Sequence, residues 1–237
     1  MTRSRADNIH IITLPMPLRM GMVNCYLIRT SAGHVLIDTG SSTARKELLQ
    51  QFASLSCTPG SLKLVILTHG DFDHTGNAAC LRSNFGARLA MHPDDLGMAE
   101  RADMFVNRKK PNILLRAILL GLSGFGRSER FTPDIFLEDE YDLSRHGLEA
   151  RVLHLPGHSR GSIGILSADG ELFCGDLFEN THGPALNSLM DDPAAANASL
   201  IKLKELTIQT IYPGHGQPFS MEAIEKYSDS NQPKSHP

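Results

Sequence analysis

The sequence predicts an α/β domain with two β-sheets inside and helices outside. Short runs of Val, Ile, Leu and Tyr recur along the whole chain, as expected for strands, and segments with helix-capping residues lie between several of them. The 237 residues suffice for one sizeable domain or two small ones, and they contain no internal repeat and no linker. We therefore expect a single domain over residues 1–237.

The first half of the chain is rich in strands. The turn Ser31-Ala32-Gly33 separates two strand-like runs, which predicts a hairpin. Ser41-Ser42-Thr43 can cap a helix that continues to Phe52, and Asn77–Arg82 is expected to form another helix. The run Leu64–Leu67 is apolar at every position, which predicts a strand buried on both faces. The strands expected in this half are His10–Leu14, Val23–Arg29, His34–Asp38, Leu64–Leu67 and Ala87–Met91.

The segment 92–132 differs in character and is predicted to be a helical insert. It is polar at first, whereas Ile113–Leu120 is apolar on nearly every side, so we expect this part to be buried. It could pack on the core, line a pocket or contact a second subunit in a homodimer. Strands are then expected at Ile135–Leu137, Glu149–His154, Ser162–Ser167, Glu171–Cys174 and Ile208–Tyr212, and helices at Pro193–Leu206 and Met221–Tyr227. The polar residues 228–237 are expected to be disordered.

Composition narrows the choice of partners. The net charge is −3 and the aromatic content is 6%, so nothing indicates a nucleic acid or a membrane surface as a partner. The start of the chain lacks the apolar core of a signal peptide, and no apolar stretch is long enough to span a bilayer. The four cysteines are widely scattered, which favours free thiols in a reducing compartment. We expect a soluble, cytoplasmic protein.

The segment T-H-G-D-F-D-H, from Thr68 to His74, is the most informative part of the chain. It places two imidazoles and two carboxylates directly after the buried strand at 64–67. Neutral imidazoles and carboxylates together are suitable ligands for zinc, manganese or iron. This density of ligand-type side chains predicts a metal site.

Three later motifs also place a glycine and then a single His or Asp after an apolar strand: Pro156-Gly157-His158, Cys174-Gly175-Asp176 and Pro213-Gly214-His215. Each one alone could be a turn or a cap, but together they predict that four strand ends converge at one edge of the sandwich. The predicted metal ligands are His69, Asp71, Asp73, His74, His158, Asp176 and His215. His182 lies just behind Asp176 and could also reach the pocket.

These motifs resemble those of the metallo-β-lactamase-fold superfamily, and the resemblance covers nearly the whole chain. The family carries H-x-H-x-D-H, then a lone His, a lone Asp and a final His. Here Asp176 follows His158 by 18 residues, and His215 follows Asp176 by 39. The run Val35–Gly40 resembles the family's early motif, in which the Asp, here Asp38, orients the metal loop.

The resemblance implies a four-layer αββα sandwich with two divalent metal ions, which in this family are usually zinc. It implies that His69, residue 71 and His158 bind one ion and that Asp176 bridges the two. Asp73, His74 and His215 would bind the other ion.

Two divalent ions roughly 3.5–4 Å apart can hold a bridging hydroxide, because metal binding lowers the pKa of water toward ~7. That hydroxide would attack a carbonyl or phosphoryl centre, so no protein nucleophile is needed. Asp73 and Asp38 are the predicted catalytic residues. Asp73 could orient the nucleophile and shuttle its proton, and Asp38 would hold a ligand histidine or the loop backbone.

Asp71 departs from the family pattern, since a histidine usually occupies its position. With three carboxylates and one hydroxide, the inner shell would balance the charge of two divalent ions, whereas a histidine at 71 would leave it at +1. We expect the extra carboxylate to raise the pKa of bound water and to favour manganese or iron over zinc. Asp is also shorter than His, and if it does not reach the ion, the alternative is a first metal site that is weak or empty.

Two classes of function remain open. The first is a metal-dependent hydrolase of a small ester, lactone, thioester or amide, and the alternative is an iron-dependent oxidoreductase of the same fold that acts on oxygen or sulfur species. Residues 101–130 carry seven basic and two acidic side chains, a net charge of +5. This segment could be a cap that attracts an anionic substrate, or a solvated helix face, which is the commoner explanation for such a charge run.

Overall fold

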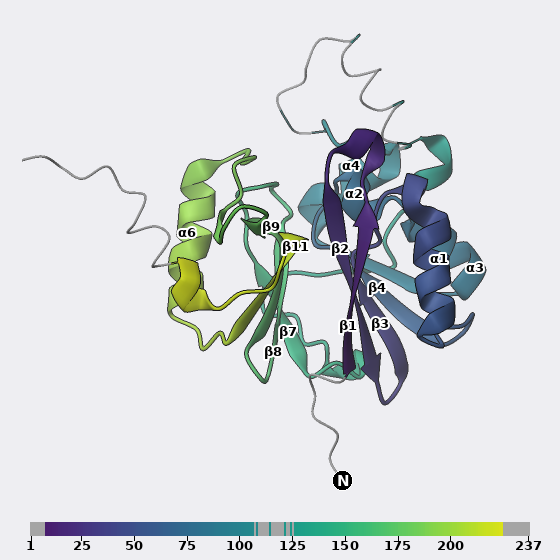
Figure 1. Ribbon diagram of the computed structural model, residues 1–237, viewed down its shortest axis with the longest axis horizontal. Coiled ribbons are helices and arrows are strands. Elements are labelled where there is room, and N and C mark those ends of the chain that lie inside the picture. Colours follow the sequence, from purple (N-terminus) through teal and green to yellow (C-terminus); the bar gives the residue numbers. More distant parts are fainter. Residues whose placement is uncertain are drawn as a thin grey trace, which may run out of the picture.

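The computed structural model describes residues 8–106 and 126–224, together with Arg108, Leu114, Gly121 and Gly124. Its first sheet has the strand order β1-β2-β3-β4-β5-β6 (Figure 1). β1 (Ile9–Pro15), β2 (Met22–Thr30) and β3 (Gly33–Ile37) are antiparallel neighbours, so the predicted hairpin is confirmed. β4, β5 and β6 extend the sheet in parallel and cover Leu62–Ile66, Arg88–Met91 and Ile135–Phe136.

The second sheet is built around β9 (Glu171–Asn180). β9 pairs antiparallel with β8 (Ile163–Ser167), which pairs in turn with β7 (Ala150–His154). β10 (Ala185–Leu186) pairs antiparallel with the end of β9, and β11 (Thr210–Gly216) pairs with β9 in parallel. The parallel pairing of β9 with β11 holds the last two motif residues in the sequence, Asp176 and His215, on neighbouring strands.

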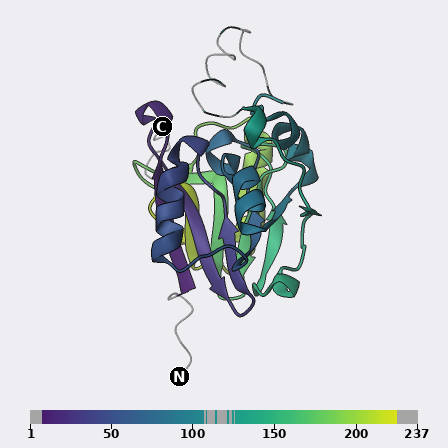
Figure 2. The same ribbon diagram turned by 90° about the vertical axis from the view of Figure 1, so that its right-hand side faces the viewer.

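Three apolar clusters separate four layers. Alternation along β4 divides its side chains: Leu64 and Ile66 enter the cluster between the two sheets, while Val65 enters the cluster under the first pair of helices. Those helices are α1 (Arg45–Ser54) and α3 (Ala78–Phe85), which cover the outer face of the first sheet (Figures 1 and 2). α6 (Pro193–Lys204) packs on the outer face of the second sheet. The predicted αββα sandwich is thus confirmed, and burial of both faces explains the unbroken apolar run in β4.

The sequence does not predict one short helix or the full length of two strands. α2 (Phe72–Thr75) forms a single turn over the last three residues of the T-H-G-D-F-D-H segment and Thr75. α4 (Leu96–Arg101) begins the predicted helical insert, as expected. β9 and β11 both run further than expected, because each completes the backbone hydrogen bonds of the other.

Most of the apolar run Ile113–Leu120 and all of residues 228–237 lie outside the described residues, as do Lys109, Lys110 and Arg116. Leu114 is described and its side chain is 70% exposed, which is at odds with the expected burial of that run. All four cysteines lie in described segments and are free thiols, as expected. Within the described ranges, no helix combines the length and the apolar character needed to cross a membrane.

Tyr26 on β2 connects the two sheets near the later motifs. Its buried ring packs against Phe173 of β9 and Tyr212 of β11, with centroids 5.0 and 5.5 Å away. Its hydroxyl donates a hydrogen bond to the Pro213 carbonyl at 2.5 Å, and Asn24 donates to the same oxygen at 3.2 Å. This pair of bonds anchors the strand that carries His215 to the first sheet.

We therefore expect Tyr26→Ala to lower the free energy of unfolding by about 3–5 kcal/mol, because it empties a large buried volume between the sheets. Tyr26→Phe removes only the hydroxyl and should cost about 1 kcal/mol, since Asn24 still donates to Pro213. Urea unfolding of both variants measures these values. A loss below about 1 kcal/mol in Tyr26→Ala would contradict the inter-sheet role of this ring.

Candidate metal centre

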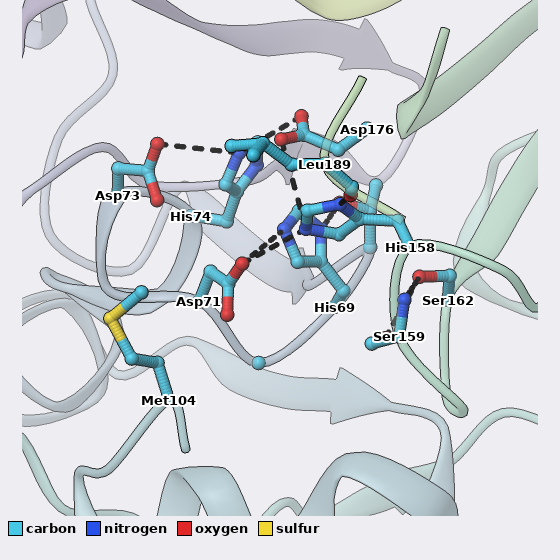
Figure 3. Close-up of polar contacts among 12 residues, drawn as sticks. His69, Asp71, Asp73, His74, Met104, His158, Ser159, Ser162, Asp176 and Leu189 are labelled. Carbon is cyan, nitrogen blue, oxygen red and sulfur yellow. Dashed lines mark hydrogen bonds and ion pairs between the residues drawn. The ribbon is translucent and has the colours of Figure 1, made fainter. Parts of the chain in front are cut away.

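The predicted ligand side chains converge at one end of the sandwich. They form two groups in which the ligand-type atoms lie within 4.8 Å of one another: His69, His158 and Asp176 in the first, and Asp73, His74 and His215 in the second. His69 follows β4, Asp73 and His74 lie on α2, and His158 lies on the loop after β7. Figure 3 shows the rings of His69, His74 and His158 turned toward one another, with Asp71 and Asp176 on either side.

Two of these residues lie within strands and not on loops past them. β9 continues through Asp176, and β11 includes His215. The glycines expected in loops instead adapt the strands. Gly175 has a φ of +52°, which re-aims the chain just before Asp176, and a Cβ on Gly214 would lie 2.2 Å from Oδ1 of Asp176. Only glycine at 214 lets β11 approach the carboxylate this closely.

Asp176 belongs to the first group and also faces the histidines of the second. Its Oδ1 is 3.2 Å from Nε2 of His74, and its Oδ2 is 3.3 Å from Nε2 of His215 and 3.9 Å from Nε2 of His158. In the second group, Oδ2 of Asp73 lies 3.4 Å from Nε2 of His215. Ligands at about 2.0–2.2 Å from a tetrahedral ion are about 3.3–3.6 Å apart, so this spacing suits a metal.

Buried polar atoms without hydrogen bonds point to the same place. Nε2 of His69, Nε2 of His74 and Oδ1 of Asp176 are fully buried and make no hydrogen bond of good geometry. Such atoms are rare in native proteins and call for a partner such as an ion. The donor set, its spacing and its unsatisfied atoms therefore fit metal ions.

All four histidines are held through Nδ1, which leaves Nε2 directed into the cluster. Carbonyl and carboxylate oxygens can only accept, so each Nδ1 bound to one must carry the proton. The Nδ1 atom of His158 donates to the Leu189 carbonyl at 2.6 Å, and that of His215 donates to the Met22 carbonyl at 2.7 Å. The corresponding atom of His74 donates to Asp38 at 2.8 Å. In His69 it lies 3.0 Å from the Thr68 hydroxyl.

Asp38 organises the loop that follows β4. One of its carboxylate oxygens accepts from the Thr68 backbone amide at 2.8 Å, and the other accepts from the Thr68 hydroxyl at 2.7 Å as well as from His74. Because the Thr68 hydroxyl donates to Asp38, it accepts from His69, so Asp38 acts on both histidines. Both carboxylate oxygens of Asp38 accept hydrogen bonds, so neither is free to face the cluster. These contacts suit a positioning residue.

Asp71 lies beside the first group. Its Oδ2 is 2.9 Å from Nε2 of His158 and 3.6 Å from Nε2 of His69, and its Oδ1 forms an ion pair with Arg108. Burial alone would raise the pKa of Asp71, but Arg108 and the two histidines hold that pKa well below its usual value. The short side chain thus reaches two of the histidines that the sequence assigned to the first metal.

The histidines and carboxylates perturb one another strongly. Burial opposes a charge on His74, yet Asp176, Asp38 and Asp73 together raise its pKa well above the ordinary value. Burial also opposes a charge on His215, but the nearby carboxylates, Asp176 first, raise its pKa to about 11. The pKa of Asp176 is lowered well below its usual value by His215 and His74, against the effect of burial. Without metal, the cluster therefore holds protons that a metal ion must displace.

Asp95 is a positioning residue that the sequence did not reveal. Its buried carboxylate accepts from the Gly70 amide at 2.9 Å, the Ser159 hydroxyl at 2.6 Å and the Gly161 amide at 2.9 Å. It thereby joins the loop of His69 to the loop of His158. The signal was present, because Asp95 also follows an apolar strand, but its partners are two backbone amides and a serine hydroxyl that no sequence motif links to it.

A third group of ligand-type residues, His92, Asp94 and His154, lies outside this cluster. The two imidazoles stack with their centroids 4.1 Å apart and their planes 6° from parallel. Nδ1 of His92 accepts from the Asp94 amide, and Nε2 of His154 lies 2.8 Å from the Arg160 carbonyl, so these rings have structural uses. His182, which was expected to be able to reach the pocket, has an exposed side chain.

Comparisons of this chain with known proteins agree on one family. Residues 18–215 match the model of the metallo-beta-lactamase superfamily. The hydroxyacylglutathione hydrolase GloC of Haemophilus influenzae is 31% identical over 173 residues, which cover 72% of this chain and 71% of that protein. The acyl-coenzyme A thioesterase MBLAC2 of Bos taurus is 28% identical over 220 residues, which cover 85% of this chain and 75% of that protein.

Among solved structures, that of TTHA1623 in a di-iron-bound form superposes with a TM-score of 0.67 at 31% identity, covering 88% of this chain and 95% of that one. The chain is shorter than several curated relatives, since its alignments with three of them span 66%, 62% and 58% of their lengths.

The Thr68 hydroxyl offers a test of how the first group is oriented. Thr68→Val removes the acceptor for His69 and a donor to Asp38, so we expect the affinity of the first group for a metal ion to fall by about tenfold. Thr68→Ser keeps the hydroxyl and should bind metal as the wild type does. Competition with a chromophoric chelator measures both affinities. Equal affinities for the Val variant and the wild type would show that the hydroxyl does not orient His69.

The pH dependence of stability should differ with and without metal. Because the pKa of His215 is raised to about 11 in the folded protein, its contribution to stability is complete below the unfolded value of 6.5 and declines as the pH rises toward 11. The lowered pKa of Asp176 contributes a constant amount in this range. Metal needs unprotonated histidines, so stabilisation by metal should instead increase with pH.

We therefore expect the Tm of chelator-treated protein to fall between pH 6.5 and about pH 9, while the increase in Tm on adding metal grows. Thermal unfolding in matched buffers, with EDTA or with metal, measures both trends. A metal-induced increase in Tm that shrinks as the pH rises would contradict proton displacement from these histidines.

Proposed function

Because this chain belongs to the metallo-β-lactamase superfamily and its relatives are metallo-hydrolases, we propose that it is a hydrolase with two metal ions that cleaves a small thioester or related acyl substrate. The observation that carries this proposal is the position of Asp176, whose two oxygens face the histidines of both groups. A carboxylate in that position suits two ions that share one ligand.

Each side chain has a distinct task in this proposal. When bound, two divalent ions would act as Lewis acids and lower the pKa of an attacking water toward ~7. His69, Asp71 and His158 would hold one ion, Asp73, His74 and His215 the other, and Asp176 both. A carboxylate oxygen of Asp73 would also accept the proton that the attacking water releases. Asp38 would keep His74 and, through Thr68, His69 in the tautomer that presents Nε2.

The substrate class rests on the relatives. The two named relatives act on hydroxyacylglutathione and on acyl-coenzyme A, and both of these substrates are thioesters. A thioester therefore ranks first among the ester, lactone, thioester and amide substrates that the sequence leaves open. The most direct experiment is a hydrolase panel of these four classes, run on protein loaded separately with zinc, manganese and iron.

Metal identity separates this function from its alternative. A carboxylate ligand considered without its partners favours manganese or iron over zinc, and TTHA1623 has been seen in a di-iron-bound form. This argument and this comparison keep an iron-dependent oxidoreductase as the second candidate. A visible absorption band from bound iron, together with no turnover on the hydrolase panel, would favour that alternative.

Asp176→Ala should abolish hydrolysis, because both metal groups lose the carboxylate that they share. We expect a fall of at least about 10³-fold in kcat and a metal content below two ions per chain. Metal analysis and turnover on the best substrate measure the two effects. Wild-type turnover in this variant would refute the shared-ligand mechanism.

Asp192→Ala is a matched control, because that aspartate caps α6 with hydrogen bonds to the amides of Ala194 and Ala195 and takes no part in either metal group. It should cost about 1 kcal/mol of stability and leave metal content unchanged.

A further inference from the structure

Arg108 contacts the candidate metal centre directly, through Asp71. It belongs to the basic segment 101–130, but its side chain is only 11% exposed and points inward. It forms an ion pair with Oδ1 of Asp71 and donates to Asp191 at 2.5 Å. It also donates to the His158 carbonyl at 3.1 Å and to the Met104 carbonyl at 3.3 Å. A buried guanidinium with these partners is not part of a solvated helix face.

The two oxygens of Asp71 have different surroundings. Oδ1 is held by Arg108, while Oδ2 faces Nε2 of His158 and of His69. Arginine remains protonated in proteins and donates from a rigid planar fork, so it fixes the carboxylate that it contacts. With Oδ1 held in this way, Asp71 can offer a metal ion one oxygen only.

The ion pair also changes the charge of the centre. Asp71, Asp73 and Asp176 bring three negative charges into one buried cluster. Arg108 adds one positive charge at contact distance from Asp71, so this buried pair is neutral, as an uncharged imidazole would be. Asp191 also pairs with Arg108, but its side chain is 37% exposed, so solvent screens its charge more strongly. Asp71 alone would make the centre more anionic, as expected from the sequence. Its ion pair with Arg108 offsets that negative charge.

We propose that Arg108 is a positioning residue of the first metal group, which neutralises Asp71 and restricts it to a single ligating oxygen. The pair then takes the place of one neutral ligand, and the preference for zinc over manganese depends on the pair and not on Asp71 alone. This inference rests on the metal centre proposed above.

A double-mutant cycle tests the compensation of charge. Asp71→His supplies a neutral ligand but leaves Arg108 as a buried cation beside the metal, so we expect the affinity for one zinc ion to fall by at least about tenfold. Arg108→Met leaves Asp71 without compensation and free to use both oxygens, and should shift the zinc-to-manganese affinity ratio toward manganese by about tenfold. The double variant should bind zinc within about threefold of the wild type, because its ligand is neutral and no buried cation remains beside the metal.

The measurements are metal stoichiometry by elemental analysis and dissociation constants by chelator competition, with Tm of the metal-free proteins as the check of folding. Arg108→Lys keeps the charge without the fork, so its zinc-to-manganese ratio should stay closer to the wild type than that of Arg108→Met. Arg82→Met is a matched control, because it breaks a surface pair with Asp134 at 2.8 Å and should leave both affinities unchanged.

The outcomes distinguish this inference from the proposed function. If the double variant binds zinc no better than Asp71→His, or worse, the losses simply add, and Arg108 is a structural tie with no compensating role. If Arg108→Lys and Arg108→Met have the same metal ratio, the charge is irrelevant and the inference is wrong. If the wild type itself binds no metal with defined stoichiometry, the proposed function fails and this inference fails with it.

Discussion

The candidate metal centre depends on the hydrogen bonds that the buried Asp38 carboxylate accepts. This carboxylate accepts three hydrogen bonds, from the amide and the hydroxyl of Thr68 and from His74, and it thereby holds the loop between β4 and α2. Through Thr68 it also reaches His69. A buried carboxylate is tolerated only when it is well satisfied, so the loop and the carboxylate stabilise each other. The same bonds determine which nitrogen of His69 and of His74 faces the cluster.

The four-layer packing brings the remaining ligands to this loop. Tyr26 and Asn24 bind the Pro213 carbonyl and so hold β11 against the first sheet, while β9 and β11 pair in parallel. Asp176 and His215 therefore arrive from the second sheet, and His69 and His74 from the first. Asp95 joins the loops of His69 and His158. The centre lies where the two sheets meet, and its geometry is as rigid as their shared core.

The net charge of this cluster depends on the insert as well as on the motif residues, because Arg108 pairs with Asp71. Asp71 would be a third carboxylate in a small buried space, yet it pairs with Arg108, which lies 37 residues further along the chain. Electrostatic arguments from a motif alone omit such partners, because the ion pair joins segments that are remote in sequence. The basic segment therefore contributes at least one residue to the interior, whatever its other residues do in solvent.

The sequence by itself determined the sandwich and the set of candidate ligands, because both depend on local patterns: apolar runs of strand length, and His or Asp beside glycine after such runs. The unbroken apolar β4 correctly indicated burial on both faces. The sequence did not show that Asp176 and His215 lie inside strands, or that Asp95 and Arg108 contact the centre. Those features depend on the pairing of β9 with β11 and on the packing of distant loops. Only the tertiary structure decides them, since hydrogen bonds to backbone atoms and ion pairs between remote segments leave no local signature.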